Sequence, residues 1–138
     1  MLLKAVANLQ DPGLRGELEA YLLDASAPVR ASAAQSLAVL GSQDSRPALL
    51  GALEVEPRGI VRAAFVASMR FMPADELALR TVHARVLDEP HPEARAEMVR
   101  YLLAHLDTFE EARPTLRHLF HNDPTKRIRM LAAAALRP

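Results

Sequence analysis

The stretch DASAPVRASAAQSLAVLG, residues 24–41, decides the fold of this chain. It consists of an acid, a short turn, a Val-Arg pair and an alanine-rich apolar segment that ends in glycine. Alanine and leucine are strong helix formers, and a glycine directly after such a segment is typical of a helix carboxyl end. The stretch therefore predicts a helix over 27–40 that follows a defined turn.

The same arrangement occurs four times along the chain. An apolar residue precedes an arginine at Val29-Arg30, Val61-Arg62, Ala94-Arg95 and Ile128-Arg129, at spacings of 32, 33 and 34 residues. Apolar residues follow three, four and seven positions after each arginine, which places them on one face of a helix. An acid stands six residues before each arginine, at Asp24, Glu56, Glu89 and Asp123. The sequence therefore predicts four copies of one turn-and-helix unit, whose helix we call the A helix.

A second helical pattern, the B helix, lies between successive A helices. Its apolar pairs are Leu18/Leu22, Leu49/Leu53, Val82/Val86 and Leu116/Phe120. Asp44 and Asp75 precede two of these patterns and are predicted to cap the helices that follow. Together the patterns predict nine helices, over 2–9, 13–23, 27–40, 45–54, 59–71, 75–87, 91–105, 109–120 and 125–136. No strand pattern or Gly/Ser-rich linker interrupts them, so one all-α domain over residues 1–138 is expected.

The acid–arginine units, with an alanine- and leucine-rich helix after each, resemble the HEAT-repeat family, especially its short bacterial form first named from phycobilisome lyases. The copy over 24–41, followed by RPALLGAL over 46–53, carries the resemblance most clearly. The resemblance covers residues 11–136 and implies a right-handed α/α solenoid of four repeats, incomplete at both ends, with the B helices on the concave side. Stacked helix pairs bury apolar stripes that one pair cannot bury alone. The third copy departs from the pattern, with Ala94 for Val and Met98 for Ala.

The charge of the chain is balanced overall and uneven along its length. The formal net charge is +0, but the segment from Arg113 onward carries six Lys or Arg against the single acid Asp123. The net charge does not favour a nucleic-acid-binding protein, whereas the basic segment leaves nucleic-acid binding open. The chain has no cysteine, which excludes disulfides and thiol nucleophiles and is typical of a cytoplasmic protein. The strong preference for Arg over Lys suggests a GC-rich bacterial gene.

The repeated acid and arginine are predicted to be structural. Each carboxylate is expected to accept hydrogen bonds in the turn before an A helix, and each arginine to pair along the stack. The alternative is an array of ligand-binding charges. The predicted ladder consists of Asp24, Arg30, Glu56, Arg62, Glu89, Arg95, Asp123 and Arg129.

The B helices offer the candidate binding surface, because basic residues recur near the start of their apolar patterns. The predicted partner-binding residues are Arg15, Arg46, Arg80, His83, Arg113, Arg117 and His118. Such a strip suits an acidic peptide, a phosphate-bearing ligand or nucleic acid. The alternative is an ordinary solvated helix face. No aromatic residue alternates with the arginines, which disfavours single-stranded nucleic acid.

Catalysis and metal binding find little support in the sequence. No Gly-rich phosphate loop, HExxH or Gly-x-Ser-x-Gly motif is present. His118 and His121, three residues apart with Asp123 nearby, form only a weak zinc pattern. Paired carboxylates lie at predicted helix starts, where negative charge complements the helix dipole. We therefore expect a protein that is not an enzyme, with no metal and no cofactor.

The leading functional hypothesis is a protein-interaction scaffold that binds a protein or peptide along the B helices and does not enter a membrane. The first alternative is nucleic-acid binding, as in DNA-alkylation-repeat proteins. The second is a lyase-like accessory role in handling a chromophore, which rests on family analogy alone.

The last predicted A helix has no B helix after it, so one side of Ile128, Leu131, Ala132 and Ala135 is expected to lie uncovered. Three explanations stay open: the chain is a piece of a longer protein, it self-associates through this helix, or a partner covers it.

Overall fold

The computed structural model describes residues 12–41 and 43–137, and every regular element in this part of the chain is helical. The eight α-helices are α2 (Pro12–Tyr21), α3 (Ala27–Leu40), α4 (Arg46–Val55), α5 (Gly59–Met69), α6 (Glu76–Val86), α7 (Pro92–Ala104), α8 (Arg113–Asn122) and α9 (Lys126–Ala132). Three short 3-10 helices accompany them: η1 (Gln43–Ser45), η2 (Glu110–Ala112) and η3 (Ala133–Leu136). The predicted all-α class is confirmed. The helix predicted over 2–9 lies outside the described residues.

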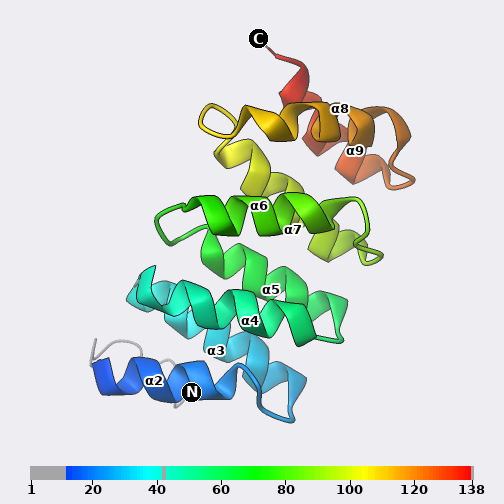
Figure 1. Cartoon of the computed structure of the whole chain (residues 1–138). Helices are drawn as coiled ribbons and strands as arrows, with labels where there is room; N and C mark the ends of the chain where they lie inside the picture. Colours follow the sequence, from blue (N-terminus) through cyan, green and yellow to red (C-terminus); the bar gives the residue numbers. More distant parts are fainter. Residues whose placement is uncertain (1–11, 42, 138) are drawn as a thin grey trace. The chain divides into compact units, whose positions relative to one another are not determined.

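The chain divides into two compact units, Met1–Pro73 and Ala74–Pro138. In the first unit, α3 packs against α2 and α5, and α4 packs against α5. In the second unit, α7 packs against α6 and α9, and α8 packs against α9 and η3. Within each unit the B helices α2 and α4, or α6 and α8, form one layer, and the A helices form the other (Figure 1). Each unit therefore contains the stacked helix pairs that the repeats predict.

The core of each unit consists of the apolar positions that follow the repeated arginines. The side chains three and four residues after the arginine are fully buried in three copies: Ala33 and Ala34, Phe65 and Val66, Met98 and Val99. Burial of one large apolar side chain contributes about 1.5–3 kcal/mol to folding, so these faces stabilise the helices that carry them. In α3 the small alanines allow α2 and α5 to pack closely against one helix.

The helix ends follow local sequence in two places and depart from expectation in a third. Gly41 ends α3 with φ of 68°, and its N–H donates to the Leu37 carbonyl at 3.1 Å, as expected of a glycine cap. Asp75 caps α6, because its carboxylate accepts from the Ala78 N–H at 2.7 Å. The cap predicted at Asp44 is wrong. Asp44 lies within η1, and Ser45 occupies the position before α4.

Two predicted B helices begin with a 3-10 turn. Pro47 and Pro114 stand in the first turn of α4 and α8, directly after η1 and η2. A proline is tolerated at this position, because the N–H groups of the first helical turn have no carbonyl partner within the helix. The helices predicted over 45–54 and 109–120 are split into a 3-10 turn and an α-helix.

The carboxyl-terminal helix differs from the prediction in two ways. The continuous helix predicted over 125–136 changes to 3-10 geometry at Ala133, and Arg113 Nη1 donates to the carbonyls of Ala135 and Arg137 beyond that point, at 2.8 and 2.9 Å. The expected exposure of Ile128, Ala132 and Ala135 is wrong. All three are fully buried within the second unit, whereas Leu131 is half-buried. The α8 helix and its arginine cover this end of α9, which the sequence pattern alone did not show.

Candidate functional site

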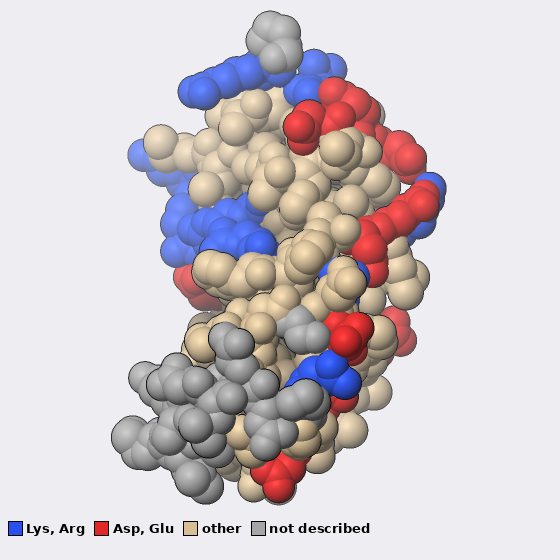
Figure 2. Space-filling model, turned by 90° about the vertical axis from the view of Figure 1, so that its left-hand side faces the viewer, with Lys and Arg blue, Asp and Glu red and all other residues tan. Residues whose placement is uncertain are grey.

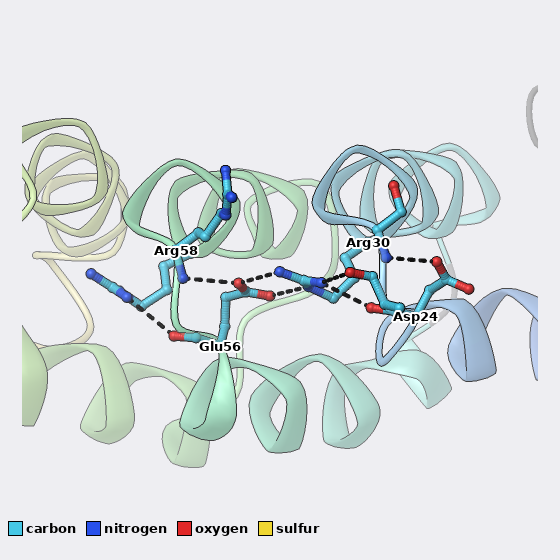
Figure 3. A network of polar contacts seen from close by, with 7 residues as sticks. Asp24, Arg30, Glu56 and Arg58 are labelled. Atoms are coloured by element: carbon cyan, nitrogen blue, oxygen red, sulfur yellow. Dashed lines mark hydrogen bonds and ion pairs between the residues drawn. The ribbon is translucent and has the colours of Figure 1, made fainter.

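In the first unit the repeated acid and arginine meet across two successive turns (Figure 3). Arg30 holds both carboxylate oxygens of Glu56, with Nε–Oε1 at 2.7 Å and Nη2–Oε2 at 3.0 Å. Its remaining nitrogen, Nη1, donates to the main-chain carbonyls of Asp24 and Ala25 at 2.8 and 3.2 Å. The guanidinium therefore joins the turn before α3 to the turn before α5.

Glu56 is buried and anionic in this arrangement. Its side chain is 1% exposed, and it accepts the Arg58 N–H at 3.0 Å besides the two bonds from Arg30. Burial alone would raise the pKa of Glu56, but the hydrogen bonds from Arg30 and from the Arg58 N–H outweigh it and hold the pKa below its ordinary value of 4.5. The same pairing raises the pKa of Arg30.

The second unit repeats the arrangement with Arg95 and Asp123. Arg95 Nε and Nη2 bond the two carboxylate oxygens at 2.7 and 3.1 Å, and Nη1 donates to the Glu89 carbonyl at 2.8 Å. Asp123 also accepts the Thr125 N–H at 2.8 Å. Arg95 and Asp123 are 7% and 5% exposed, so this ion pair is buried. Bidentate contacts of this kind fix the relative orientation of the two side chains as well as pairing their charges.

The other ladder residues show the local part of the same geometry. Asp24 and Glu89 each accept the N–H two residues later, at Ser26 and His91, both at 2.9 Å. Arg62 and Arg129 each donate through Nη1 to the carbonyl six residues back, at 3.1 and 2.7 Å. The constant spacing of six residues therefore has a physical reason. It lets an arginine on the first turn of an A helix donate to a carbonyl in the turn before that helix. Sequence reasoning missed this main-chain contact, although the constant spacing pointed to it.

The arginines predicted to form the binding strip are largely engaged with acids of neighbouring turns. Arg15 Nη1 bonds Asp44 at 3.1 Å, and Arg80 bonds Glu76 at 2.7 Å and lies 3.7 Å from Glu111. These pairs neutralise much of the expected basic surface.

Arg113 and Arg46 are engaged in a different way. Arg113 bonds Glu110 at 2.8 Å in addition to its two carbonyl contacts at the end of the chain. Arg46 is only 6% exposed, and its Nη2 donates to the Pro73 carbonyl. Arg46 is therefore not part of the exposed surface of the B helices.

The basic residues of α8 are more accessible. Arg117 and His118 are exposed, and Arg117 bonds no acid in the part of the chain that the structure describes. The ring of His118 lies 3.3 Å from the Asn122 amide nitrogen. His83 on α6 is half-buried, with Nε2 at 2.8 Å from the Thr115 hydroxyl and its ring edge against Phe109. Of the predicted strip, the structure leaves Arg117 and His118 most open to a partner.

The surface view agrees with this local neutralisation. Along the right-hand side of Figure 2, acidic side chains lie beside basic ones, and a denser group of Lys and Arg lies toward its left-hand side. The pairing of Arg15 with Asp44 and of Arg80 with Glu76 gives the residue-level cause on two B helices. No continuous strip of free positive charge follows from these contacts.

Two hollows were not found by sequence reasoning. In the first unit an apolar hollow of about 250 Å³ lies between α3 and α5, where Val39 and Phe71 are 63% and 68% exposed. In the second unit a hollow of about 340 Å³ is lined by the buried Arg95–Asp123 pair, His118 and Leu87. Phe71 is a large apolar residue just after an A helix, and it was the available signal in the sequence for the first hollow. Among residues 12–41 and 43–137, no three His, Asp or Glu side chains are grouped to hold a metal ion.

A family model of HEAT repeats matches residues 1–70, which is half of the chain, and the chain belongs to the HEAT-repeat family. The matching model describes these repeats in general and carries no information on the narrower phycobilisome-lyase type. HEAT repeats commonly mediate protein–protein interactions. Neither the curated proteins nor the solved structures contain a significant match to the chain. None of the helices in the described part of the chain has the length and apolar character that crossing a membrane requires.

Proposed function

We propose that the chain is a non-enzymatic scaffold that binds a partner protein or peptide along its B helices, with α8 as the main contact. The observation that carries this proposal is Arg117, which is exposed and bonds no acid of the described chain. An acidic side chain of a partner can pair with Arg117 without displacing an existing bond. At Arg80 the same acid has to compete with Glu76 and Glu111.

Other exposed side chains on the B helices of this unit suit a peptide or protein better than a polyanion. His118 adds a second polar group on α8, and the α6 helix carries Leu77, whose side chain is 63% exposed. Arginine is among the residues enriched in interaction hot spots. A partner with isolated acids among apolar residues fits this surface, because dense negative charge would meet the acids that already pair with Arg80 and Arg113.

The test compares baits that differ in one exposed charge. Arg117→Glu is expected to lower the recovery of a specific partner by at least about tenfold, because it places an acid opposite the partner's acid. Arg58→Glu is the matched control, since Arg58 is equally exposed but lies in the turn before α5. Both changes are on the surface and are expected to leave folding within about 0.5 kcal/mol of the original. Quantitative capture from cells that express the gene measures the difference. A partner set retained equally by all three baits contradicts the assignment to α8.

Nucleic-acid binding is the competing function, and the ion pairs of the B helices argue against it. A phosphate that approaches Arg15, Arg80 or Arg113 competes with the carboxylate that each of them already bonds. Retention on duplex DNA that falls steeply with salt is the behaviour expected of phosphate contacts. We expect no retention at low salt, and strong retention at low salt would favour the competing function over a protein scaffold.

A further inference from the structure

We call the contact in which an arginine holds the acid of the next copy with two nitrogen atoms the acid–arginine joint. Within residues 12–41 and 43–137, Asp24 and Arg129 each lack the other half of this joint. At Asp24 the turn is formed as in the other copies, with the carboxylate accepting the Ser26 N–H at 2.9 Å. Glu56 and Asp123, in the same position, are each held by two nitrogen atoms of an arginine from the preceding copy. Within residues 12–41 and 43–137, no guanidinium bonds the Asp24 carboxylate. Asp24 therefore supplies the acid of a joint for which the described residues supply no arginine.

Arg129 supplies the arginine of a joint for which the described residues supply no acid. Its Nη1 donates to the Asp123 carbonyl at 2.7 Å, the same contact that orients Arg30 and Arg95. In those two arginines, Nε and Nη2 then hold a carboxylate. In the described chain Arg129 has no such acceptor. The guanidinium is therefore oriented for a carboxylate that these residues do not supply.

Apolar residues beside Asp24 and Arg129 are less buried than the equivalent residues of the other copies. Val29 is half-exposed, whereas the equivalent Val61, Ala94 and Ile128 are at most 1% exposed. Ala133 is half-exposed, whereas the equivalent Ala34, Val66 and Val99 are fully buried. Among the described residues, Val29 and Ala133 are therefore less covered than their equivalents in the other copies.

A hollow lies beside Arg129 and gives this end room for a packed neighbour. It measures about 360 Å³ and is lined by Phe120, Lys126, Arg129, Met130 and Ala133. Met130 is 66% exposed. The surface therefore combines two cations with apolar side chains, which suits an acid carried on an apolar helix turn.

We propose that this surface binds a second copy of the chain head to tail, with Arg129 of one copy holding Asp24 of the next in the geometry of the Arg30–Glu56 joint. The charges are complementary, and the acid turn is already formed on one side while the arginine is already oriented on the other. The contact uses two different surfaces, so it does not close on itself in a dimer and allows further copies to add. It is independent of partner binding at Arg117.

The test is a charge exchange followed by light scattering on the full chain. The unaltered protein is expected to show a mass that rises above 15.2 kDa between about 10 µM and about 1 mM. Arg129→Glu places a second acid opposite Asp24 of the next copy, and Asp24→Arg places a second arginine opposite Arg129. Each variant alone is expected to bind its own copies at least about 30-fold more weakly, because like charges meet at the joint.

An equimolar mixture of the two variants distinguishes the proposed joint from every other contact. In the mixture, the unaltered Asp24 of the Arg129→Glu variant can pair with the unaltered Arg129 of the Asp24→Arg variant. The two altered residues can also pair with each other, with the positions of acid and arginine exchanged. Association is therefore expected to return to within about threefold of the unaltered protein. Recovery in the mixture also shows that both variants are folded.

Three results would overturn the proposal. The first is a mass that stays at 15.2 kDa for the unaltered protein at about 1 mM. The second is association that either variant retains alone at the strength of the unaltered protein. The third is a mixture of the two variants that stays monomeric.

Discussion

The turns before the A helices and the surfaces of the B helices both use arginine, but in different environments. At the turns, Arg95 is 7% exposed, holds Asp123 through two nitrogen atoms and donates to a carbonyl six residues back. On the B helices, the side chain of Arg80 is 55% exposed and pairs with Glu76 and Glu111, which are more exposed still. The first arginine has one defined set of partners, whereas the second can exchange its partners with solvent or with another molecule.

This difference distinguishes two kinds of position within one repeat. The positions at which the four copies agree form the joint that stacks one copy on the next. The positions at which they disagree lie on the B helices, where each unit presents its own set of paired and unpaired charges. In the proposed function, a partner that is specific to this chain contacts the second set of positions.

Removal of Arg95 is expected to have the largest effect. Arg95→Ala leaves the carboxylate of Asp123 buried without its cation, so the free energy of unfolding is expected to fall by about 3–5 kcal/mol. Urea denaturation followed by circular dichroism measures this loss. Arg58→Ala, at an exposed turn position, serves as the control and is expected to change little. A loss at Arg95 no larger than at Arg58 would remove the distinction between joint and surface.

Glu56 offers a test of the joint through pH. Glu56→Gln is expected to lower the free energy of unfolding at pH 7 by about 1–3 kcal/mol, because a charged hydrogen-bond acceptor of Arg30 is lost. The pKa of Glu56 is lowered in the folded chain, so its contribution is present above its ordinary value of 4.5 and is lost as the pH falls through the folded pKa. The difference between variant and original should therefore shrink on acidification. A difference that stays constant from pH 7 to well below 4.5 would argue against an ionised Glu56 in the joint.

Two glycines sharpen the comparison at smaller magnitude. Gly41 closes an A helix with a positive φ of 68°, so Gly41→Ala is expected to destabilise the chain by about 1 kcal/mol. Gly51 lies on the exposed face of the B helix α4, where an added Cβ meets nothing within 4 Å. Gly51→Ala is therefore expected to stabilise by about 0.5–1 kcal/mol. Thermal melting of the two variants should shift in opposite directions, and shifts of the same sign would show that one of these environments is misassigned.

The smallest effect is expected at Arg80. Its ion pairs with Glu76 and Glu111 are exposed, so Arg80→Ala should leave the denaturation midpoint within experimental error at moderate salt. Arg80→Lys, which keeps the charge, is the matched control. A clear loss of stability in the alanine variant that lysine restores would place Arg80 with the joint residues.

The periodic pattern is sufficient for the fold because it depends on positions that repeat. The helix α3 has the bounds that the sequence predicts, with Gly41 as its cap, because both follow from local propensity. The end of α9 does not follow from the pattern, since its change to 3-10 geometry and the burial of Ile128 depend on Arg113 and α8, which lie in a different segment. The cap predicted at Asp44 fails because the 3-10 turn η1 includes Asp44 and makes Ser45 the residue before α4; the Asp44 side chain bonds Arg15 of another helix.

The candidate surface is harder to predict than the fold. The sequence identifies which arginines lie on the B helices, but their pairing with acids of the adjacent turn depends on how neighbouring B helices pack. The burial of Arg46 likewise depends on the Pro73 carbonyl, which is distant in sequence. A charge count along one helix cannot show such neutralisation, so Arg117 emerges only from the structure.

A pair of double-mutant cycles tests most directly whether the repeated arginine is a joint and the B-helix arginine a surface charge. One cycle combines Arg95→Ala with Asp123→Ala, and the other combines Arg80→Ala with Glu76→Ala, with the free energy of unfolding measured for each variant. We expect a coupling of about 2 kcal/mol or more between Arg95 and Asp123, and no measurable coupling between Arg80 and Glu76. Equal coupling in the two cycles, or none between Arg95 and Asp123, would contradict the account.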